Sequence, residues 1–454
     1  MKHIIIKIDV SKYIGKVPQW RGANYYPSDS PVGGIHFKKE DIKWAKNTGF
    51  NHLRDCHLNG DLLEKENEPG KYNKQLLTQI ETNLNWFESY GIKSILDMHN
   101  AMGRKYGGDP RFWQNKLFQE RWVKQWGIIA KNFAGHPSLL GYDLLNEPEP
   151  NNPYPTRENI DTWNTLIRKA TDEIRKYDTN SVIVICSLNY ANANMFHKLV
   201  PSGDKNTWYS FHCYEPSPWH CQKRTWNEDT GTYHYPGNIR GVYWNRNTLK
   251  YIFSEPYEFH KRYNAPIYCG EFGCVSDVPP MEDVLWLVDI ISLFHELGFN
   301  WALYNFFTRT KNPYYQEHFD CNIYLKYVPT NKLFINKRKL DIVSFFAKAK
   351  GMTLKLEQPE DDMVTVYAHK RNNNIVEILV SNKSPDENKT AIIKIETGNR
   401  EKIAVLDYMF IDKNFITWEK LQNPEIKNGN IFITIPIQSI KKLSLKVEPK
   451  KKTR

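Results

Sequence analysis

The sequence predicts a mixed α/β fold, in which a (β/α)8 barrel (TIM barrel) is followed by a small C-terminal antiparallel β-sandwich. Two observations predict it. Up to about residue 350, short β-branched or apolar runs alternate with longer stretches of helical spacing, whereas beyond Gly351 one strand pattern follows another. Strands separated by helices pair in parallel, and eight such units match the size of a barrel. We expect residues 1–351 to form the barrel and residues 352–454 the sandwich.

Eight segments have the composition of buried parallel strands. In chain order they are 19–25, 50–54, 94–99, 139–145, 181–187, 208–214, 265–272 and 300–306. Helical spacing separates them, and the clearest apolar helix face is formed by Phe118, Trp122, Trp126, Ile129 and Phe133. The stretch 215–250 is long enough to be a loop insertion. An open doubly wound sheet is the alternative, but no glycine-rich phosphate loop follows the first strand.

The last hundred residues show the two-residue period of strands with one buried face. Isoleucine occupies every second position from Ile431 to Ile437, and Leu443, Leu445 and Val447 repeat the pattern. Clusters of Asn, Asp, Gly and Lys separate these runs, which predicts about six antiparallel strands. We find no catalytic constellation in this part of the sequence.

The composition excludes several classes of protein. Aromatic residues make up 14% of the 454 residues, which argues against disorder, and no apolar run approaches the ~18–20 residues of a membrane span. The net charge is +11, but no recognisable nucleic-acid-binding module accompanies it. We expect a monomer with neither nucleic acid nor a membrane as partner. Charge interrupts the N-terminus too early for a signal-peptide core, so the protein is either cytoplasmic or secreted with its leader removed.

Polar residues gather at the C-terminal ends of the expected strands, where a parallel barrel carries its active site. Six of the eight strands contribute. The residues are Arg54-Asp55, His99-Asn100, Asn146-Glu147-Pro148, His212-Cys213-Tyr214, Glu271-Phe272-Gly273 and Trp301. Because these strand ends meet at one mouth of the barrel, we expect the side chains to form a single site.

Glu147 and Glu271 are the pair on which the chemistry depends. They lie at the ends of the fourth and seventh strands, so their carboxyl groups can face one another across the barrel mouth. Hydrolysis of a glycosidic bond needs an acid that protonates the leaving oxygen and a carboxylate that meets the developing oxocarbenium ion. A separation of ~5–5.5 Å gives retention, whereas ~6.5–9.5 Å admits a water and gives inversion. One such glutamate alone is as easily a salt-bridge partner, but two at these positions favour catalysis.

The other strand-end residues are candidate substrate-binding groups. Arg54 can hold Glu271 ionised, because a nearby cation lowers the pKa of a carboxylate, and Tyr214 can donate to the same carboxylate. Asn146 can bind a sugar 2-hydroxyl, and Trp301 can form an apolar floor under a pyranose ring. His99 is suited to hydroxyl binding. The remaining candidates at the strand ends are Asn100 and His212.

In this ordered set of residues, the chain resembles glycoside hydrolase family 5 over roughly residues 18–345. The resemblance implies a retaining mechanism with Glu147 as the acid/base and Glu271 as the nucleophile, without cofactor or metal. It also implies a β-linked polysaccharide substrate, first of all β-1,4-glucan cut by an endoglucanase of the cellulase type, with β-mannan or another β-glucan as the alternative. The segment after Tyr214 is similar to a loop of bacterial endoglucanase-like members, in which Trp226 is a sugar platform. A polysaccharide substrate is also favoured by the loop tryptophans Trp113, Trp219, Trp226 and Trp244.

Two alternatives belong to other functional classes. A metal-dependent barrel hydrolase would use nitrogen and oxygen ligands from Asp55, His57, His99 and His212. Their spacing fits no known ligand signature, and the seven cysteines contain no C-x-x-C, so we expect buried free thiols. A non-catalytic carbohydrate-binding barrel would explain the surplus aromatic residues, but the presence of both glutamates argues against it.

Overall fold

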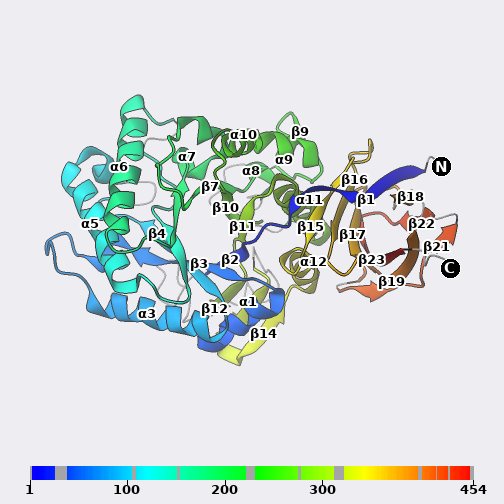
Figure 1. Cartoon of the computed structure of the whole chain (residues 1–454), viewed down its shortest axis with the longest axis horizontal. Coiled ribbons are helices and arrows are strands. Elements are labelled where there is room, and N and C mark those ends of the chain that lie inside the picture. The colour runs from blue at the N-terminus through cyan, green and yellow to red at the C-terminus, as the bar shows by residue number, and fades with distance from the viewer. Residues whose placement is uncertain are drawn as a thin grey trace.

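The computed structural model describes residues 3–25, 38–104, 109–150, 154–220, 231–274, 278–310, 322–396, 401–415, 417–427 and 430–449. A barrel surrounded by helices forms one part of the molecule, and a second β-sheet packs against its side, next to the outer helix labelled α11 (Pro280–Leu297; Figure 1). Both termini of the chain lie at the outer side of this second sheet.

Eight parallel strands close the barrel, each hydrogen-bonded to two neighbours. Around the ring they are β2 (Arg21–Tyr25), β3 (His52–Asn59), β4 (Lys93–Asn100), β5 (Leu139–Asp143), β6 (Val182–Cys186), β7 (Thr207–Cys213), β10 (Ile267–Phe272) and β11 (Asn300–Leu303). The last strand, β11, pairs with β2 and completes the ring. The prediction of a (β/α)8 barrel from eight strand segments is therefore confirmed.

Helices cover the outside of the barrel (Figure 1). The longer ones are α3 (Lys74–Ser89), α5 (Lys116–Phe133), α6 (Arg157–Arg175), α10 (Ser254–Tyr263), α11 (Pro280–Leu297) and α12 (Lys337–Ala347). The shorter ones are α1 (Ile42–Thr48), α2 (Gly60–Leu63), α4 (Arg111–Gln114), α7 (Leu188–Ala191), α8 (Ser217–His220) and α9 (Arg246–Ile252), with 3-10 turns at Lys39–Asp41, Ala193–Lys198 and Val328–Thr330. On α5, all five residues of the expected apolar face are buried. Within the described ranges, no helix combines the length and apolar composition needed to cross a membrane.

Two small sheets decorate the barrel loops. A hairpin of β8 (Gly237–Ile239) and β9 (Val242–Trp244) lies within the expected insertion 215–250. A three-stranded sheet after β11 consists of β12 (Phe307–Thr310), β13 (Tyr324–Tyr327) and β14 (Lys332–Ile335).

Alternation along the strands separates two apolar clusters. One cluster takes side chains from strands all around the ring, so it fills the barrel interior; its buried members are Ile95, Leu140, Val182, Val184, Trp208, Tyr268 and Ala302. The larger cluster lies between the strands and the outer helices. Since successive strand residues point to opposite faces, this division decides which side chains can reach the barrel mouth.

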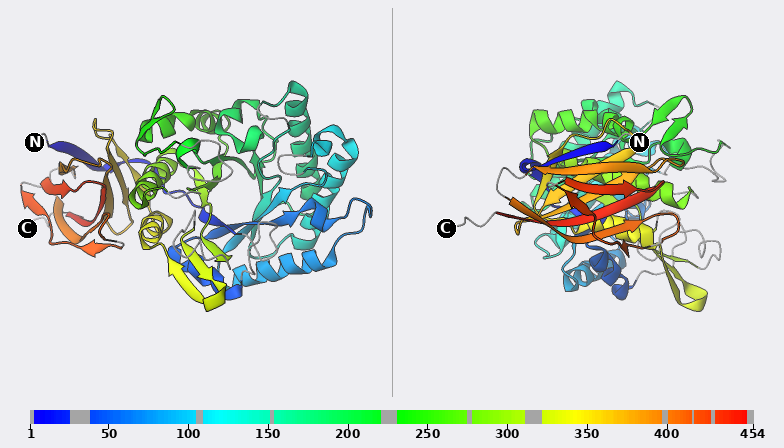
Figure 2. Two further views of the ribbon diagram at one scale, coloured as in Figure 1. Left: turned by 180° about the vertical axis from the view of Figure 1, so that it is seen from behind. Right: turned by 90° about the vertical axis from the view of Figure 1, so that its right-hand side faces the viewer.

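Within the described residues, the second sheet has ten strands, nine of which come from residues 352–454, where about six were expected. In spatial order they are β20 (Glu419–Lys420), β19 (Glu401–Ile411), β23 (Ser439–Pro449), β17 (Ile375–Asn382), β16 (Val364–Lys370), β15 (Met352–Leu356), β1 (Ile4–Lys16), β18 (Lys389–Glu396), β22 (Asn430–Ile435) and β21 (Glu425–Lys427). Because β22 also contacts β17 and β23, the sheet folds over its own apolar core as a sandwich does (Figure 2).

The first strand of the chain belongs to this sandwich and not to the barrel. β1 pairs in parallel with β18 and antiparallel with β15, and it buries Ile6, Ile8 and Val10. The expected boundary, with residues 1–351 in the barrel, therefore needs correction at the N-terminus. Apolar and charged residues alternate in β1, and we interpreted this pattern only as evidence against a signal-peptide core. It is in fact the two-residue period of a strand.

A buried ion pair joins the sandwich to the barrel. Lys383, the first residue after β17, places its Nζ 3.0 Å from Oδ2 of Asp289 on α11, and neither side chain is exposed. Thr365 of β16 donates to Oδ1 of Asp289 at 2.5 Å, and the Tyr235 hydroxyl donates to Oδ2 at 2.7 Å. Burial lowers the pKa of Lys383, while Asp289 opposes this effect. The carboxylate is thus shared by both parts of the chain and by the loop that precedes β8.

Replacing Lys383 with methionine should destabilise the fold by about 3–5 kcal/mol, because it leaves the Asp289 carboxylate buried without its cation. Thermal unfolding followed by circular dichroism measures the effect. Lys427→Met is the matched control, since Lys427 pairs with Glu425 on the exposed surface of the sandwich and should contribute little. Equal unfolding temperatures for the two variants would contradict the structural role of the buried pair.

Candidate active site

The C-terminal ends of the barrel strands bring the expected polar residues together. Arg54 lies on β3, His212 at the end of β7 and Glu271 at the end of β10. Two residues separate Asn146 and Glu147 from the end of β5, and the backbone N–H of Asn146 donates to the carbonyl of Met98 on β4 at 3.0 Å. All five side chains face the inside of the ring, as the contacts below show.

Gly270 explains how Glu271 reaches this site. A Cβ at position 270 would lie 2.8 Å from Nε2 of His212 and 2.9 Å from Oγ of Ser210, so only glycine leaves room for them. The pairing of β10 with β7 shifts register between Cys269 and Glu271. Such a bulge re-aims the following side chain, and Glu271 therefore turns into the barrel mouth next to His212.

Arg54 is the electrostatic centre of the site. It is fully buried, and its guanidinium lies 2.7 Å from Oε1 of Glu271, 2.8 Å from Oδ2 of Asp143 and 2.9 Å from Oδ1 of Asp97. It also donates to Oδ1 of Asn146 at 2.9 Å. Burial alone would lower the pKa of Arg54, but Asp97 and Asp143 outweigh it and hold that pKa well above its usual value. The arginine is therefore permanently cationic beneath Glu271.

Both carboxylate oxygens of Glu271 are fixed by donors. Oε1 accepts from Arg54, and Oε2 accepts from the hydroxyl of Tyr214 at 2.7 Å. Burial, together with the neighbouring carboxylate, raises the pKa of Tyr214 well above its usual value. Tyr214 therefore stays a neutral hydrogen-bond donor. These two contacts hold the Glu271 carboxyl group in one orientation.

Glu147 faces Glu271 across His212. Nδ1 of His212 lies 2.8 Å from Oε1 of Glu147 and 3.8 Å from Oε2 of Glu271. One ligand atom from each of the three residues lies within 4.8 Å of the others. Burial disfavours the imidazolium, but the two carboxylates outweigh it and raise the pKa of His212. The two glutamates thus meet at one point, with a hydrogen-bond donor between them.

Two further candidates lie at the end of β4. Nδ1 of His99 is 2.8 Å from Oδ2 of Asp97, and its Nε2 is 3.5 Å from Nδ2 of Asn146. The side chain of His99 is 25% exposed, so it can reach a bound molecule while Asp97 orients its ring. Asn100 is half-buried at the last position of β4, opposite Asn59 of β3. Trp226 lies outside the described residues.

Trp301 does not line the site, which corrects the interpretation of it as a sugar platform. It is fully buried, its ring packs edge-on to Phe272 with centroids 5.8 Å apart, and its indole N–H donates to Nε2 of His295 on α11. Its neighbour Ala302 belongs to the barrel interior, so alternation turns Trp301 outward. Tyr304 is two residues after Ala302 and therefore lies on the same side of the chain. It is half-buried, and the centroid of its ring lies 6.0 Å from that of Tyr214.

Other tryptophans of the loops are also structural. Trp219 is fully buried and packs on Tyr235 and Trp286, and Trp113 is buried against Trp163. Their burial removes them from the surfaces that can stack on a sugar. Tyr304 lies two residues after Ala302, so the two-residue alternation of β11 could have identified it as the aromatic side chain that faces the site.

The residues of the metal-site alternative do not converge. Asp55 lies between β3 and the outer helix α3, where Asn83 contacts it, whereas His212 lies inside the barrel mouth. Burial raises the pKa of Asp55 to about 8. Two other groups within the described ranges have metal-like spacing, Cys56–Asp97–His99 and Glu147–His212–Glu271. The Arg54 guanidinium contacts a carboxylate of each group, so its positive charge opposes a cation at either place.

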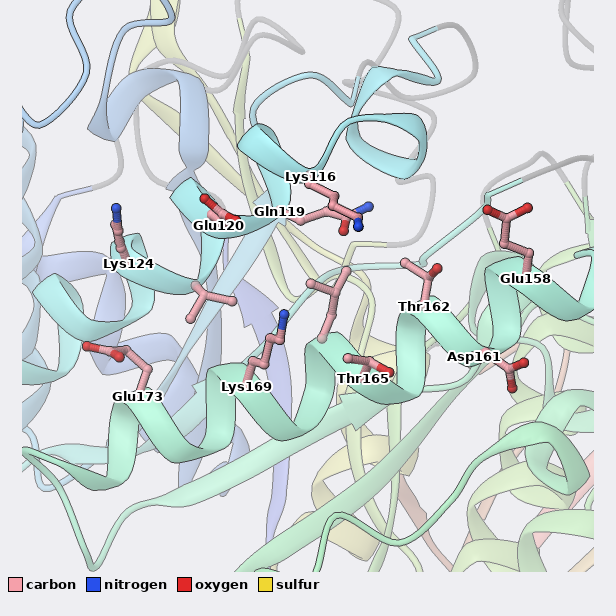
Figure 3. A pocket seen from close by; sticks show the side chains of 12 residues that line it. Lys116, Gln119, Glu120, Lys124, Glu158, Asp161, Thr162, Thr165, Lys169 and Glu173 are labelled. Atoms are coloured by element: carbon pink, nitrogen blue, oxygen red, sulfur yellow. The ribbon is translucent and has the colours of Figure 1, made fainter.

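A groove of about 940 Å³ lies away from this site, on the outside of the barrel between α5 and α6. Figure 3 shows its charged walls, with Lys116, Glu120 and Lys124 from one helix and Asp161 and Glu173 from the other. The described residues that line it include no aromatic side chain, so it lacks the stacking surface of a sugar subsite.

Residues 14–308 match the family model described as Cellulase (glycosyl hydrolase family 5). The chain belongs to glycosyl hydrolase family 5. It is a glycoside hydrolase of the cellulase type, in agreement with the resemblance found in its motifs. The family model covers the barrel, and residues 309–454 lie beyond its end.

This family 5 member is similar to several proteins of known name. Endoglucanase C of Acetivibrio thermocellus is 28% identical over 297 residues, which cover 59% of this chain and 83% of that protein. Cellodextrinase A of Ruminococcus flavefaciens is 27% identical over 267 residues, which cover 58% of this chain and 76% of that protein. Among solved structures, Cel5A of Thermotoga maritima in complex with mannotriose shares the fold with a TM-score of 0.57 at 20% identity, over 71% of this chain and 97% of that one. A hyperthermophilic endo-β-1,4-glucanase in complex with substrate has a TM-score of 0.58 at 21% identity, over 73% and 97%.

Proposed function

We propose that the protein hydrolyses β-1,4-glucan with retention of configuration, by double displacement. The observation that carries the proposal is the pair of facing carboxylates, with one oxygen of Glu147 and one of Glu271 within 4.8 Å. Retaining glycosidases separate these groups by ~5–5.5 Å and inverting ones by ~6.5–9.5 Å. The short separation supports direct attack by a carboxylate.

In the first step, Glu271 is the nucleophile. Arg54 and Tyr214 each hold one of its oxygens and aim the carboxylate at the anomeric carbon. Glu147 donates a proton to the glycosidic oxygen as the bond to the anomeric carbon breaks, and the bond to Glu271 forms. His212 fixes the rotation of the Glu147 carboxyl group through its hydrogen bond at 2.8 Å. The products are a covalent glycosyl-enzyme and a free chain end.

In the second step, water takes the place of the departed chain. Glu147, now ionised, removes a proton from this water, which attacks the anomeric carbon and releases Glu271. The same residue therefore serves as acid and then as base. Because both displacements invert the anomeric carbon, the product keeps the configuration of the substrate.

The surrounding side chains bind the sugar in this proposal. Asn146, fixed by Arg54, is placed to donate to the 2-hydroxyl next to the reacting carbon, a contact that strengthens in the transition state. His99, with its ring oriented by Asp97, and Asn100 bind further hydroxyls. Tyr304 forms an aromatic wall next to Tyr214 in place of Trp301. Trp226 remains a predicted platform.

The relatives favour β-1,4-glucan over other polymers. Two of them are named as an endoglucanase and a cellodextrinase, and one structural neighbour is titled an endo-β-1,4-glucanase. Mannan is the second candidate substrate, because Cel5A of Thermotoga maritima was solved with mannotriose.

A substrate panel tests the proposal. The purified protein is incubated with carboxymethylcellulose, lichenan, xyloglucan and mannan, and the released reducing ends and product sizes are measured. We expect release from carboxymethylcellulose and lichenan, with NMR of the first products showing the β-anomer. Release from mannan alone would move the substrate to the second candidate, an α-anomer would overturn retention, and no release from any polymer would overturn the polysaccharide assignment.

A further inference from the structure

Arg104 is a fully buried arginine that the catalytic scheme above does not use. It lies in the loop after β4, and its Nη2 donates to the backbone carbonyl of Glu147 at 2.6 Å. Its Nε donates to Oε2 of Glu149 at 2.8 Å, and its Nη1 donates to the backbone carbonyl of His99 at 3.3 Å. One guanidinium thus ties the end of β4 to the segment that follows β5.

The backbone of Glu147 needs such support. Its φ is 43°, in the left-handed region that a glutamate rarely adopts. A conformation of this kind persists only where the surroundings fix it, and it is typical of functional sites. The backbone N–H of the preceding residue, Asn146, donates to the carbonyl of Met98, and the carbonyl of Glu147 itself accepts from Arg104. Glu147 is therefore clamped on both sides, and its backbone sets the direction of its carboxyl group.

We infer that Arg104 is a positioning residue for the acid/base, acting through the peptide carbonyl of Glu147 and never touching the substrate. This inference rests on the proposed function, in which Glu147 exchanges the proton. Glu149 is the counter-charge that allows the arginine to be buried. Arginine suits the position because its planar fork donates in several fixed directions, whereas lysine offers a single charged nitrogen.

A displaced Glu147 has a distinct kinetic signature. Proton transfer to the leaving oxygen becomes slower. Attack by Glu271 is unchanged, because Arg54 and Tyr214 hold the nucleophile independently of Arg104. A substrate whose leaving group departs without a proton should therefore tolerate the loss of Arg104. A poor leaving group should not.

The experiment compares the intact protein with Arg104→Met and Arg104→Lys on two aryl β-cellobiosides. Phenyl cellobioside needs acid assistance, and 2,4-dinitrophenyl cellobioside does not. For Arg104→Met we expect kcat/KM on the phenyl substrate to fall by about 100-fold, within the range of general acid catalysis, and on the dinitrophenyl substrate by only a few-fold. Arg104→Lys preserves the charge beside Glu149 but loses the planar fork. Its kcat/KM on the phenyl substrate should lie between those of the intact protein and Arg104→Met, and it should again lose less on the dinitrophenyl substrate.

Arg121→Met is the matched control. Arg121 is also buried, lies 3.2 Å from Glu64, and donates to the carbonyls of Lys65 and Glu66. These partners include none of the residues assigned to the site. Its loss should change both substrates by the same factor and leave their ratio unchanged.

The outcomes separate the inference from the proposed function. Equal losses on both substrates, or a substrate ratio like that of Arg121→Met, would overturn the positioning role of Arg104 while the intact enzyme still hydrolyses both. Should Arg104→Met fail to fold, the ratio measured for Arg104→Lys decides in the same way. An intact protein inactive on both cellobiosides and on every polysaccharide of the panel would overturn the proposed function and this inference together.

Discussion

The Glu271→Ala variant should lose turnover of polysaccharides and activated aryl cellobiosides alike. We expect kcat/KM to fall on the order of 10⁴-fold or more, as when a catalytic nucleophile is removed from other enzymes. The physical reason is that a good leaving group replaces the proton donor but not the attacking carboxylate. Arg54 and Tyr214 would then face an empty space with no oxygen to aim. Steady-state kinetics on carboxymethylcellulose and 2,4-dinitrophenyl cellobioside measures the loss.

Glu64→Ala provides the matched control for this variant. Glu64 is also a buried glutamate paired with a buried arginine, Arg121, and neither of the two is among the residues assigned to the site. Its loss should lower the unfolding temperature and leave catalysis by the folded enzyme nearly unchanged.

Azide added to Glu271→Ala should not restore product with the configuration of the substrate. A β-configured glycosyl azide from this variant would show that another residue is the nucleophile.

Much of the site could be predicted because a parallel barrel reduces the problem to strand ends and alternation. Arg54 on β3 and His212 near the end of β7 lie on faces that the two-residue period turns inward. Glu271 joins them because the register shift in β10 turns it toward the barrel mouth. Their mutual contacts then follow from ring closure. For the same reason the eight strands were visible from the sequence without knowledge of any neighbour.

The errors have one physical origin, which is register. The sequence of residues 300–303 predicts a strand, but the neighbouring strands decide which of its side chains face the barrel interior. In the structure, Ala302 faces the interior and Trp301 faces outward. The partners of β1 lie more than three hundred residues away, on β15 and β18. Local composition contains no information about such pairing.

Two buried aspartates below the barrel mouth could have been recognised in the sequence, but we did not use them in predicting the site. Asp97 stands in the apolar strand pattern of β4 and Asp143 in that of β5. A carboxylate in such a strand is expensive to bury unless a cation meets it. The two aspartates balance Arg54, which in turn serves Glu271. A charged residue inside a buried strand therefore predicts a partner of opposite sign, and here that partner belongs to the catalytic site.

The Glu147→Ala variant should discriminate between substrates where Glu271→Ala does not. We expect kcat/KM on polysaccharide to fall by ~10²–10⁴-fold, the usual contribution of general acid–base catalysis. On 2,4-dinitrophenyl cellobioside kcat/KM should fall far less, because it reports the first step, in which this leaving group needs no proton. The second step still needs a base, so the glycosyl-enzyme should accumulate, and both kcat and KM should fall on this substrate.

Azide makes the role of Glu147 directly visible. As an anion it attacks the glycosyl-enzyme without base assistance, and removal of the Glu147 side chain opens space for it beside His212. Addition of azide should therefore raise kcat on the dinitrophenyl substrate and produce the β-glycosyl azide, which NMR identifies. If Glu147→Ala and Glu271→Ala behaved identically on both substrate types, the assignment of roles would be wrong. If the leaving-group dependence and the β-azide belonged to Glu271→Ala instead, the two glutamates would have exchanged roles, and Arg54 would hold the proton donor rather than the nucleophile.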